Sequence, residues 1–386
     1  MTNNTIYLDN NATTKVAPEV IEAMMPFFDN RYGNPSSIHS FGGTVRKNID
    51  LAREQVADLV NAKPSQIYFT GCGSESDNLA IRGFHYRHGG RSRIFTSLVE
   101  HHAVLNTCKD LEKKGALYFK LGVNDKGLLD INELASLEMD EDSLLSLMWA
   151  NNETGVVFPI EKITEIVKAK GAFVHTDAVQ AIGKVPIDLK KTPVDFLALS
   201  GHKLHAPKGI GAIFIRDTTD LEPIITGGHQ EGGIRAGTEN VPYIVGLGKA
   251  CEIAKKTMQE ENVRVRALRD KLEHGILASC KDAILNGDPE LRLPNTTNIS
   301  FEFIEGESIL LLLNEHGICA SSGSACTTGS LEPSHVLRAM NVPYTRAHSA
   351  TRFSLSRYTT EKEIDIVLSV LPSIIDKLRA LSPYIK

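Results

Sequence analysis

Two short segments place a carboxylate and a lysine just after neighbouring apolar runs. Asp177 follows the run at residues 171–174, and Lys203 follows the run at residues 196–199. A lysine can form a Schiff base with an aldehyde, and a nearby acid can keep a pyridine nitrogen protonated so that the ring accepts electrons. The pair therefore predicts a site for pyridoxal 5'-phosphate (PLP).

A third segment, residues 321–326, ends on a thiol, Cys326, and is otherwise made of serine, glycine and alanine. Buried cysteines usually sit among bulky apolar residues, whereas a thiol among small residues is typical of an accessible loop. The alternative is a surface loop that carries an incidental cysteine. Together with the lysine and the acid, Cys326 predicts PLP chemistry that ends on sulfur.

Each of these residues also has an ordinary explanation. Lys203 could be a surface lysine, and Asp177 could be a turn or helix-cap aspartate. Both, however, follow apolar strands, and open α/β sheets bind ligands at the carboxyl ends of their strands. Gln180 lies about one turn after Asp177, where it could reach the phenolic oxygen of the cofactor.

Further candidates follow other apolar runs. The segment 70–75 combines glycines, hydroxyls and a helix start, which suits a phosphate but is also a common turn. His101 could stack on the pyridine ring, and its neighbour His102 is the competing choice. Arg352 opens a candidate strand, where it is either an exposed strand residue or a bidentate clamp on a substrate carboxylate.

The elements that must position these residues alternate along the chain. Between residues 65 and 216 short apolar runs alternate with amphipathic helical patterns, which predicts a mostly parallel sheet covered on both faces. The seven expected strands are 66–70, 92–98, 116–121, 144–149, 172–175, 196–199 and 211–215, and the expected helices include 76–85, 102–113 and 160–168.

The pattern changes after a glycine-rich stretch at residues 227–237. It continues with a long helix at 245–278, a strand at 298–303, a helix at 307–316, a strand at 352–355 and a last helix that opens with the capping-box pair Thr360 and Glu363. We predict an α/β large domain over residues 16–260. A smaller α+β domain would combine residues 1–15 and 261–386.

Composition limits the possible functions. The chain has 386 residues, 42% of them hydrophobic, with a net charge of −5 and no basic block, which argues against nucleic acid and membrane partners. The start of the sequence lacks the features of a signal peptide, so a cytoplasmic enzyme is expected. Six scattered cysteines without a Cys-x-x-Cys pair indicate neither a disulfide framework nor a zinc site.

Taken together, these segments resemble the cysteine desulfurases, in the class V aminotransferase group of PLP fold-type I enzymes. The resemblance is to the NifS branch, with IscS as a relative, and it runs over nearly the whole chain. One departure is Ser74, where the family usually has threonine; the hydroxyl is kept. The matching segments are residues 7–14, 33–37, 148–155, 175–180, 200–203, 235–240, 321–326 and 330–335.

The resemblance implies a role for each matching residue. Lys203 would bind PLP covalently, Asp177 would pair with the ring nitrogen, Gln180 with the phenolic oxygen, and His101 would stack on the ring. Cys326 would accept the sulfur. The residues implied for the phosphate are Gly73, Ser74, Ser200, His202 and, from a second subunit, Thr238. Those implied for the substrate are Asn34, Asn152 and Arg352, with Asn152 also near the cofactor.

The implied reaction removes sulfur from L-cysteine, giving L-alanine and a persulfide on Cys326. The sulfur would pass to an iron–sulfur scaffold protein of the NifU or IscU type, with which Cys326 could transiently ligate a cluster, for nitrogenase or for general assembly. The resemblance also implies a homodimer and no resident metal. Three alternatives stay open: a selenocysteine lyase, another fold-type I enzyme such as an aminotransferase, and a non-catalytic sulfur-relay partner.

Overall fold

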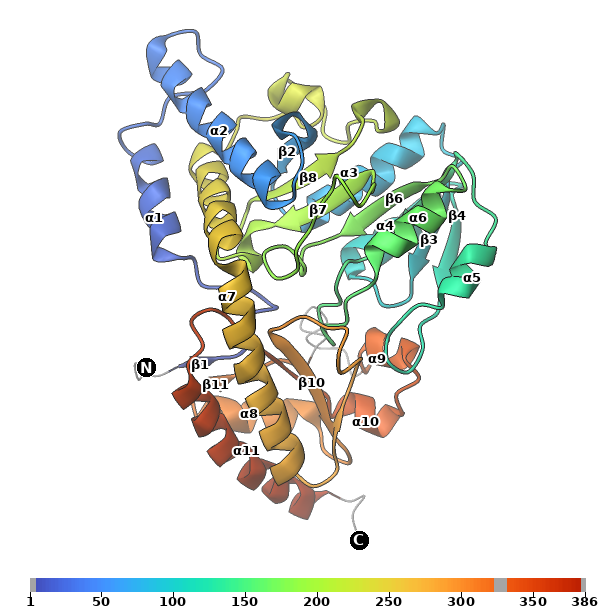
Figure 1. Ribbon diagram of the computed structural model, residues 1–386, viewed down its shortest axis with the longest axis vertical. Coiled ribbons are helices and arrows are strands. Elements are labelled where there is room, and N and C mark those ends of the chain that lie inside the picture. Colours follow the sequence, from blue (N-terminus) through green and yellow to red (C-terminus); the bar gives the residue numbers. More distant parts are fainter. Residues whose placement is uncertain (1–4, 323–331, 383–386) are drawn as a thin grey trace.

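The computed structural model describes residues 5–322 and 332–382 (Figure 1). Its largest sheet has seven strands in the order β2-β8-β7-β6-β5-β3-β4. Neighbouring strands are parallel except at β8, which is antiparallel to both β2 and β7. The predicted mostly parallel seven-stranded sheet is therefore confirmed. Its strands are β2 (Ile67–Thr70), β3 (Arg93–Ser97), β4 (Leu117–Leu121), β5 (Ser143–Ser146), β6 (Phe173–Asp177), β7 (Phe196–Ser200) and β8 (Gly211–Ile215).

Helices cover both faces of this sheet. On one face, Leu79 and Phe84 of α3 pack in one hydrophobic cluster with Phe196 of β7. On the other, Ile163 of α6 packs in a cluster with Leu197, because successive strand residues point to opposite faces. The helices of this part are α1 (Pro18–Met24), α2 (Ser40–Leu59), α3 (Gly73–Arg87), α4 (His102–Glu112), α5 (Ile131–Ser136) and α6 (Ile160–Lys168).

A second part of the molecule contains two small sheets. β1 pairs with β11 in parallel, and β10 lies between β12 and β9 in an antiparallel sheet. The last helix, α11, begins with the predicted capping box of Thr360 and Glu363. The elements are β1 (Ile6–Tyr7), β9 (Ala283–Leu285), β10 (Thr296–Phe301), α8 (Gly306–Glu315), β11 (Ile318–Cys319), α9 (His335–Ala339), α10 (Tyr344–His348), β12 (Thr351–Ser354) and α11 (Glu361–Leu381).

One long helix, α7 (Val241–Ser279), connects the two parts (Figure 1). Its first half packs in the hydrophobic cluster of the large sheet through Leu247, and its second half packs through Leu272 in a separate cluster of the smaller part. Ile6 belongs to the smaller cluster as well. The predicted domain boundary between residues 260 and 261 falls inside this helix, and the exact boundaries stay a prediction.

One predicted strand ends earlier than expected. β5 was expected to reach residue 149, but it ends at Ser146. Beyond it, the backbone N–H of Met148 donates to the carboxylate of Glu100 at 2.9 Å instead of to a neighbouring strand. Within residues 5–322 and 332–382, no helix is long and apolar enough to cross a membrane.

Candidate active site

The carboxyl ends of β6 and β7 meet at one cavity, which is also lined by residues that follow β2, β3 and β5. Asp177 is the last residue of β6, Ser200 is the last residue of β7, and Lys203 follows in a short 3-10 helix. The cavity has a volume of about 370 Å³, within the usual range of ligand pockets. The predicted site residues that line it are Gly73, Ser74, His101, Asn152, Asp177, Gln180, Ser200, His202, Lys203 and Arg352. We call this cavity the front pocket.

Three predicted site residues are not among those that line the front pocket. Asn34 and Thr238 are both exposed in the single chain, and the Asn34 side chain accepts a hydrogen bond from the backbone of Ser36 at 2.9 Å. Cys326 lies outside the described residues. The roles of these three residues stay predictions.

The amine of Lys203 is held by the N-terminal segment of the chain. Its Nζ donates to the backbone carbonyls of Asn11 and Ala12, the latter at 2.8 Å. Both residues line the front pocket, and Asn11 also accepts a hydrogen bond from the side-chain Nε2 of Gln180. Sequence analysis missed these contacts, because they join backbone atoms to a residue about 190 positions later.

Asp177 also lines the front pocket, and its side chain is buried. Burial raises its pKa to about 6, while the N–H of Val179, 2.9 Å from Oδ1, and the charge of Lys203 oppose that rise. A buried carboxylate of this kind is stabilised when a cation comes to lie beside it. Asp177 can therefore serve as the partner of a protonated ring nitrogen.

The start of α3 offers an anion site in the same pocket. The helix begins at Gly73, and Cys72 before it makes no capping side-chain hydrogen bond. A Cβ at Gly73 would lie 2.7 Å from Cγ2 of Val179, so glycine is required by close packing. The hydroxyl of Ser200 is buried and has no hydrogen-bond partner among the described residues. An uncapped helix start beside an unpaired hydroxyl suits a phosphate group.

Two histidines in the pocket are neutral. His101 caps α4 by accepting the N–H of Ala103 on Nδ1 at 3.1 Å, which leaves the proton on Nε2. Burial, followed by the charge of Lys203, lowers its pKa to about 4. The same two causes lower the pKa of His202 to about 4. His101 can therefore stack on a ring without adding charge.

Arg352, in β12 of the smaller part of the chain, also lines the front pocket. Its side chain is 2% exposed, and Nη2 pairs with Asp9 at 2.7 Å while Nη1 donates to the carbonyl of Asn152 at 2.9 Å. Its Nε is buried without a partner among the described residues. The guanidinium is thus fixed from two sides and retains N–H groups for a carboxylate. Sequence analysis did not identify Asp9 as its partner.

Two further acids are buried near Asp177, and one of them, Asp77, also lines the front pocket. Glu100 accepts hydrogen bonds from Ser97 and Met148, and burial raises its pKa to about 8. Burial and the charge of Asp177 raise the pKa of Asp77 well above its usual value. Glu100 therefore favours the protonated form at neutral pH, and the pKa of Asp77 is shifted in the same direction. Sequence analysis missed both, because the pattern alone does not show which polar residue of a helix or loop is enclosed.

The lysine, the opposed carboxylate and the anion site at a helix start fit PLP. The fold and this site define a PLP fold-type I enzyme, and comparison with known proteins narrows the class. The family model for class V aminotransferases matches residues 6–367. A cysteine desulfurase of Trichormus azollae is 56% identical over 379 residues, covering 98% of this chain and 95% of that protein.

Other relatives agree. The cysteine desulfurase NifS of Azotobacter vinelandii is 56% identical over 380 residues, covering 98% of this chain and 94% of that protein. A solved NifS-like protein superposes with a TM-score of 0.91 at 40% identity, covering 97% of this chain and all of that one. A solved SspA in complex with cysteine superposes with a TM-score of 0.81 at 36% identity, covering 92% of this chain and all of that one. The chain belongs to the cysteine desulfurase family of class V aminotransferases.

Proposed function

We propose that this chain is a PLP-dependent cysteine desulfurase that converts L-cysteine to L-alanine and transfers the sulfur to Cys326. The observation that carries the proposal is the front pocket, where Lys203 and the buried carboxylate of Asp177 line one cavity beside the start of α3. The identity to cysteine desulfurases over nearly the full chain supports it.

The residues that would hold PLP divide by position in the pocket. Gly73, Ser74, Ser200 and His202 would bind the phosphate, and Asp177 would pair with the ring nitrogen. When bound, PLP links to Lys203 and stabilises negative charge at the substrate Cα. The Nε2 of Gln180 donates to the carbonyl of Asn11 at 3.0 Å, and its buried Oε1 has no partner among the described residues. The Nε2 group has a second N–H, which could donate to the phenolic oxygen of the cofactor.

The chain's own residues would then bind cysteine and move a proton. Arg352, already oriented by Asp9, would hold the substrate carboxylate through its remaining N–H groups, with Asn152 beside it. The amine of Lys203 would take the Cα proton once it is neutral. The carbonyls of Asn11 and Ala12 accept from this amine and would hold it near its working position.

The sulfur acceptor is assigned from sequence. Cys326 lies between Ser322 and Glu332, the last described residues on either side. Its thiolate would attack the substrate sulfur, so that a persulfide forms on Cys326 and the C–S bond breaks. The electron pair of that bond would stay on the substrate Cβ, which takes up a proton and becomes the methyl group of L-alanine. The described thiol that lines the front pocket is Cys72, which makes Cys72 the matched control for Cys326.

A homodimer and a sulfur acceptor protein belong to the same proposal. The segment from α1 to the start of α2 lies at one edge of the molecule in Figure 1. It exposes several large apolar side chains, as expected of an interface, namely Ile21, Met25, Phe28, Tyr32, Ile38 and Phe41. Asn34 lies in this segment and would reach the pocket of a second copy, as would Thr238. The persulfide would pass to an iron–sulfur scaffold of the NifU or IscU type.

The test is release of L-alanine and sulfide from L-cysteine by PLP-loaded protein with a reductant. We expect equal amounts of both products. Cys326→Ala should retain the visible absorption of bound PLP and lose turnover, whereas Cys72→Ala should keep turnover. Undiminished alanine release by Cys326→Ala would instead favour a lyase that needs no acceptor thiol. Sedimentation of the loaded protein as a monomer would exclude the dimer.

A further inference from the structure

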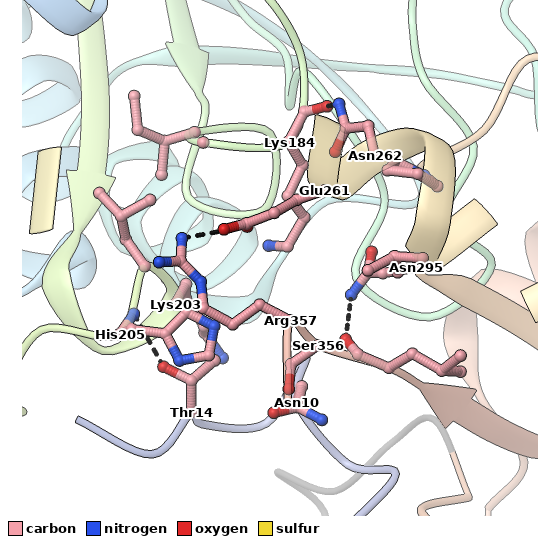
Figure 2. A pocket seen from close by; sticks show the side chains of 16 residues that line it. Asn10, Thr14, Lys184, Lys203, His205, Glu261, Asn262, Asn295, Ser356 and Arg357 are labelled. Atoms are coloured by element: carbon pink, nitrogen blue, oxygen red, sulfur yellow. Dashed lines mark hydrogen bonds and ion pairs between the residues drawn. The ribbon is translucent and has the colours of Figure 1, made fainter. Parts of the chain in front are cut away.

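A second, smaller cavity also has Lys203 in its wall (Figure 2). Its volume is about 50 Å³, enough for roughly one water molecule. Lys203 lines both this cavity and the front pocket. We call it the rear cavity. Nothing in the desulfurase reaction described above uses it.

Lys184 is fixed at the wall of the rear cavity. Figure 2 shows its ammonium group pointing into the cavity, where it donates to the carbonyl of Gln180 at 3.0 Å. Lys184 as a whole is half-buried, whereas its ammonium group is enclosed. The side chain of Asn262 donates to the carbonyl of Lys184 at 2.7 Å. The backbone and the amine of Lys184 are therefore both held.

The backbone before Lys184 packs directly against the residue after Lys203. Gly183 has a φ of +71°, and a Cβ there would lie 2.1 Å from Cδ1 of Leu204. Only glycine permits this approach. The turn that carries Lys184 and the turn that carries Lys203 are thus in close contact, which fixes the backbones of the two lysines relative to each other.

The other charged groups around Lys184 cancel or are neutral. Glu261 is the one acidic side chain among the described residues that line the rear cavity, and it pairs with Arg357 at 3.2 Å. Burial lowers the pKa of His202 and that of His205 to about 4 each, so both rings are uncharged near neutral pH. Lys184 is therefore left without an anionic side chain of its own in this cavity.

We infer that Lys184 is a positioning residue for the proposed desulfurase reaction, because its ammonium group behind Lys203 disfavours a positive charge on Lys203 and so favours the neutral amine. A lysine beside a second cation in a region of low polarity is more easily deprotonated. The effect is reciprocal: burial first, and then the charge of Lys203, lowers the pKa of Lys184 to about 7. The two amines therefore compete for a proton near neutral pH, and Lys184 acts on Lys203 in the fraction of molecules in which Lys184 is protonated. The role of Lys184 rests on the proposed function of Lys203 as a base.

The test compares variants that remove or keep the charge at position 184. Lys184→Met and Lys184→Gln remove it, Lys184→Arg keeps it at every pH, and Lys191→Met removes an exposed lysine charge elsewhere as a control. In full-length protein freed of PLP, the pH dependence of Lys203 acetylation by acetic anhydride is followed by mass spectrometry. In the PLP-loaded protein, the visible absorption is titrated over the same pH range.

We expect Lys184→Met and Lys184→Gln to raise the apparent pKa of Lys203 by about one unit, the size of shift that a nearby buried charge produces. Lys184→Arg should leave it at or below the wild-type value, and Lys191→Met should not change it. Shifts of Lys184→Met and Lys184→Arg in the same direction, or no shift in either, would overturn the inference. If wild-type protein bound no PLP, the proposed function would fail, yet the acetylation profile would still decide the role of Lys184.

Discussion

Lys203 stands between two enclosures of opposite chemical character. In and around the front pocket, burial raises the pKa of carboxyl groups, to about 6 for Asp177, which lines the pocket, and to about 8 for Glu100, which is not among its lining residues. In the rear cavity, burial lowers the pKa of the Lys184 amine to about 7. The same cause acts in both places, because burial disfavours whichever form is charged. Lys203 therefore lies between Asp177, whose charge favours the ammonium form, and Lys184, which by the inference above disfavours it.

The two enclosures also differ in how they are built. The front pocket is formed largely where strands of one sheet end, with Asp177 and Ser200 at the ends of adjacent strands. The rear cavity joins residues from both hydrophobic clusters, since Leu204 belongs to the large one and Val265 and Leu355 to the small one. The front pocket thus depends mainly on one sheet, whereas the rear cavity depends on the packing of two parts of the chain.

The largest effect is expected from removing the anion of the front pocket. Asp177→Asn should lower kcat by about 10²–10³-fold, the usual size for loss of one electrostatic contact to a reacting centre. The measurement is steady-state turnover of L-cysteine, with Asp125→Asn, an exposed residue, as the control. A kcat within about threefold of wild type would show that the carboxylate of Asp177 does not stabilise the reacting centre.

Sequence patterns reveal the front pocket far better than the rear cavity. Asp177 and Lys203 each follow a run of consecutive apolar residues, and such runs predict buried strands whose ends share one edge. The partners Asp9 and Glu100 could not be found this way, because a polar residue in a loop or before a helix carries no mark of its burial. The surroundings of Lys184 could not be predicted from the sequence either, because one of the residues that hold it is Asn262, which is 78 positions away.

The buried carboxyl group of Glu100 and the amine of Lys184 should make the free energy of unfolding depend on pH in opposite directions. Glu100 binds a proton in the folded state up to about pH 8 but is ionised above about pH 4.5 when unfolded, so folding stability falls as pH rises through this window. The contribution is on the order of a few kcal/mol. Thermal unfolding midpoints of Glu100→Gln between pH 5 and 7.5 should fall less with pH than those of wild type; an unchanged slope would contradict this.

Lys184 should act in the opposite direction, over a pH window that begins near pH 7. It loses its proton near pH 7 in the folded state but keeps it to about pH 10.5 when unfolded, so the unfolded chain binds more protons and stability rises with pH between these values. Lys184→Met should remove this rise, measured as thermal midpoints between pH 7.5 and 9.5, while Lys191→Met should retain it. A wild-type slope in Lys184→Met would mean that the amine is not enclosed.

The smallest effect is expected from Glu261, which neutralises Arg357 at the mouth of the rear cavity. The two side chains are 25% and 14% exposed, so solvent and salt screen their charges more than that of Lys184. Glu261→Gln leaves the charge of Arg357 uncompensated and should lower the apparent pKa of Lys203, in the acetylation profile, by about a few tenths of a unit.

This small shift is most informative when it is measured at two salt concentrations. At high salt the effect of Glu261→Gln should largely disappear, whereas the upward shift caused by Lys184→Met should persist, because enclosed charges are screened less than charges near solvent. The two substitutions also act in opposite directions on Lys203, since one adds net positive charge to the rear cavity and the other removes it. An upward shift in Glu261→Gln would show that packing, and not charge, connects this wall of the cavity to Lys203.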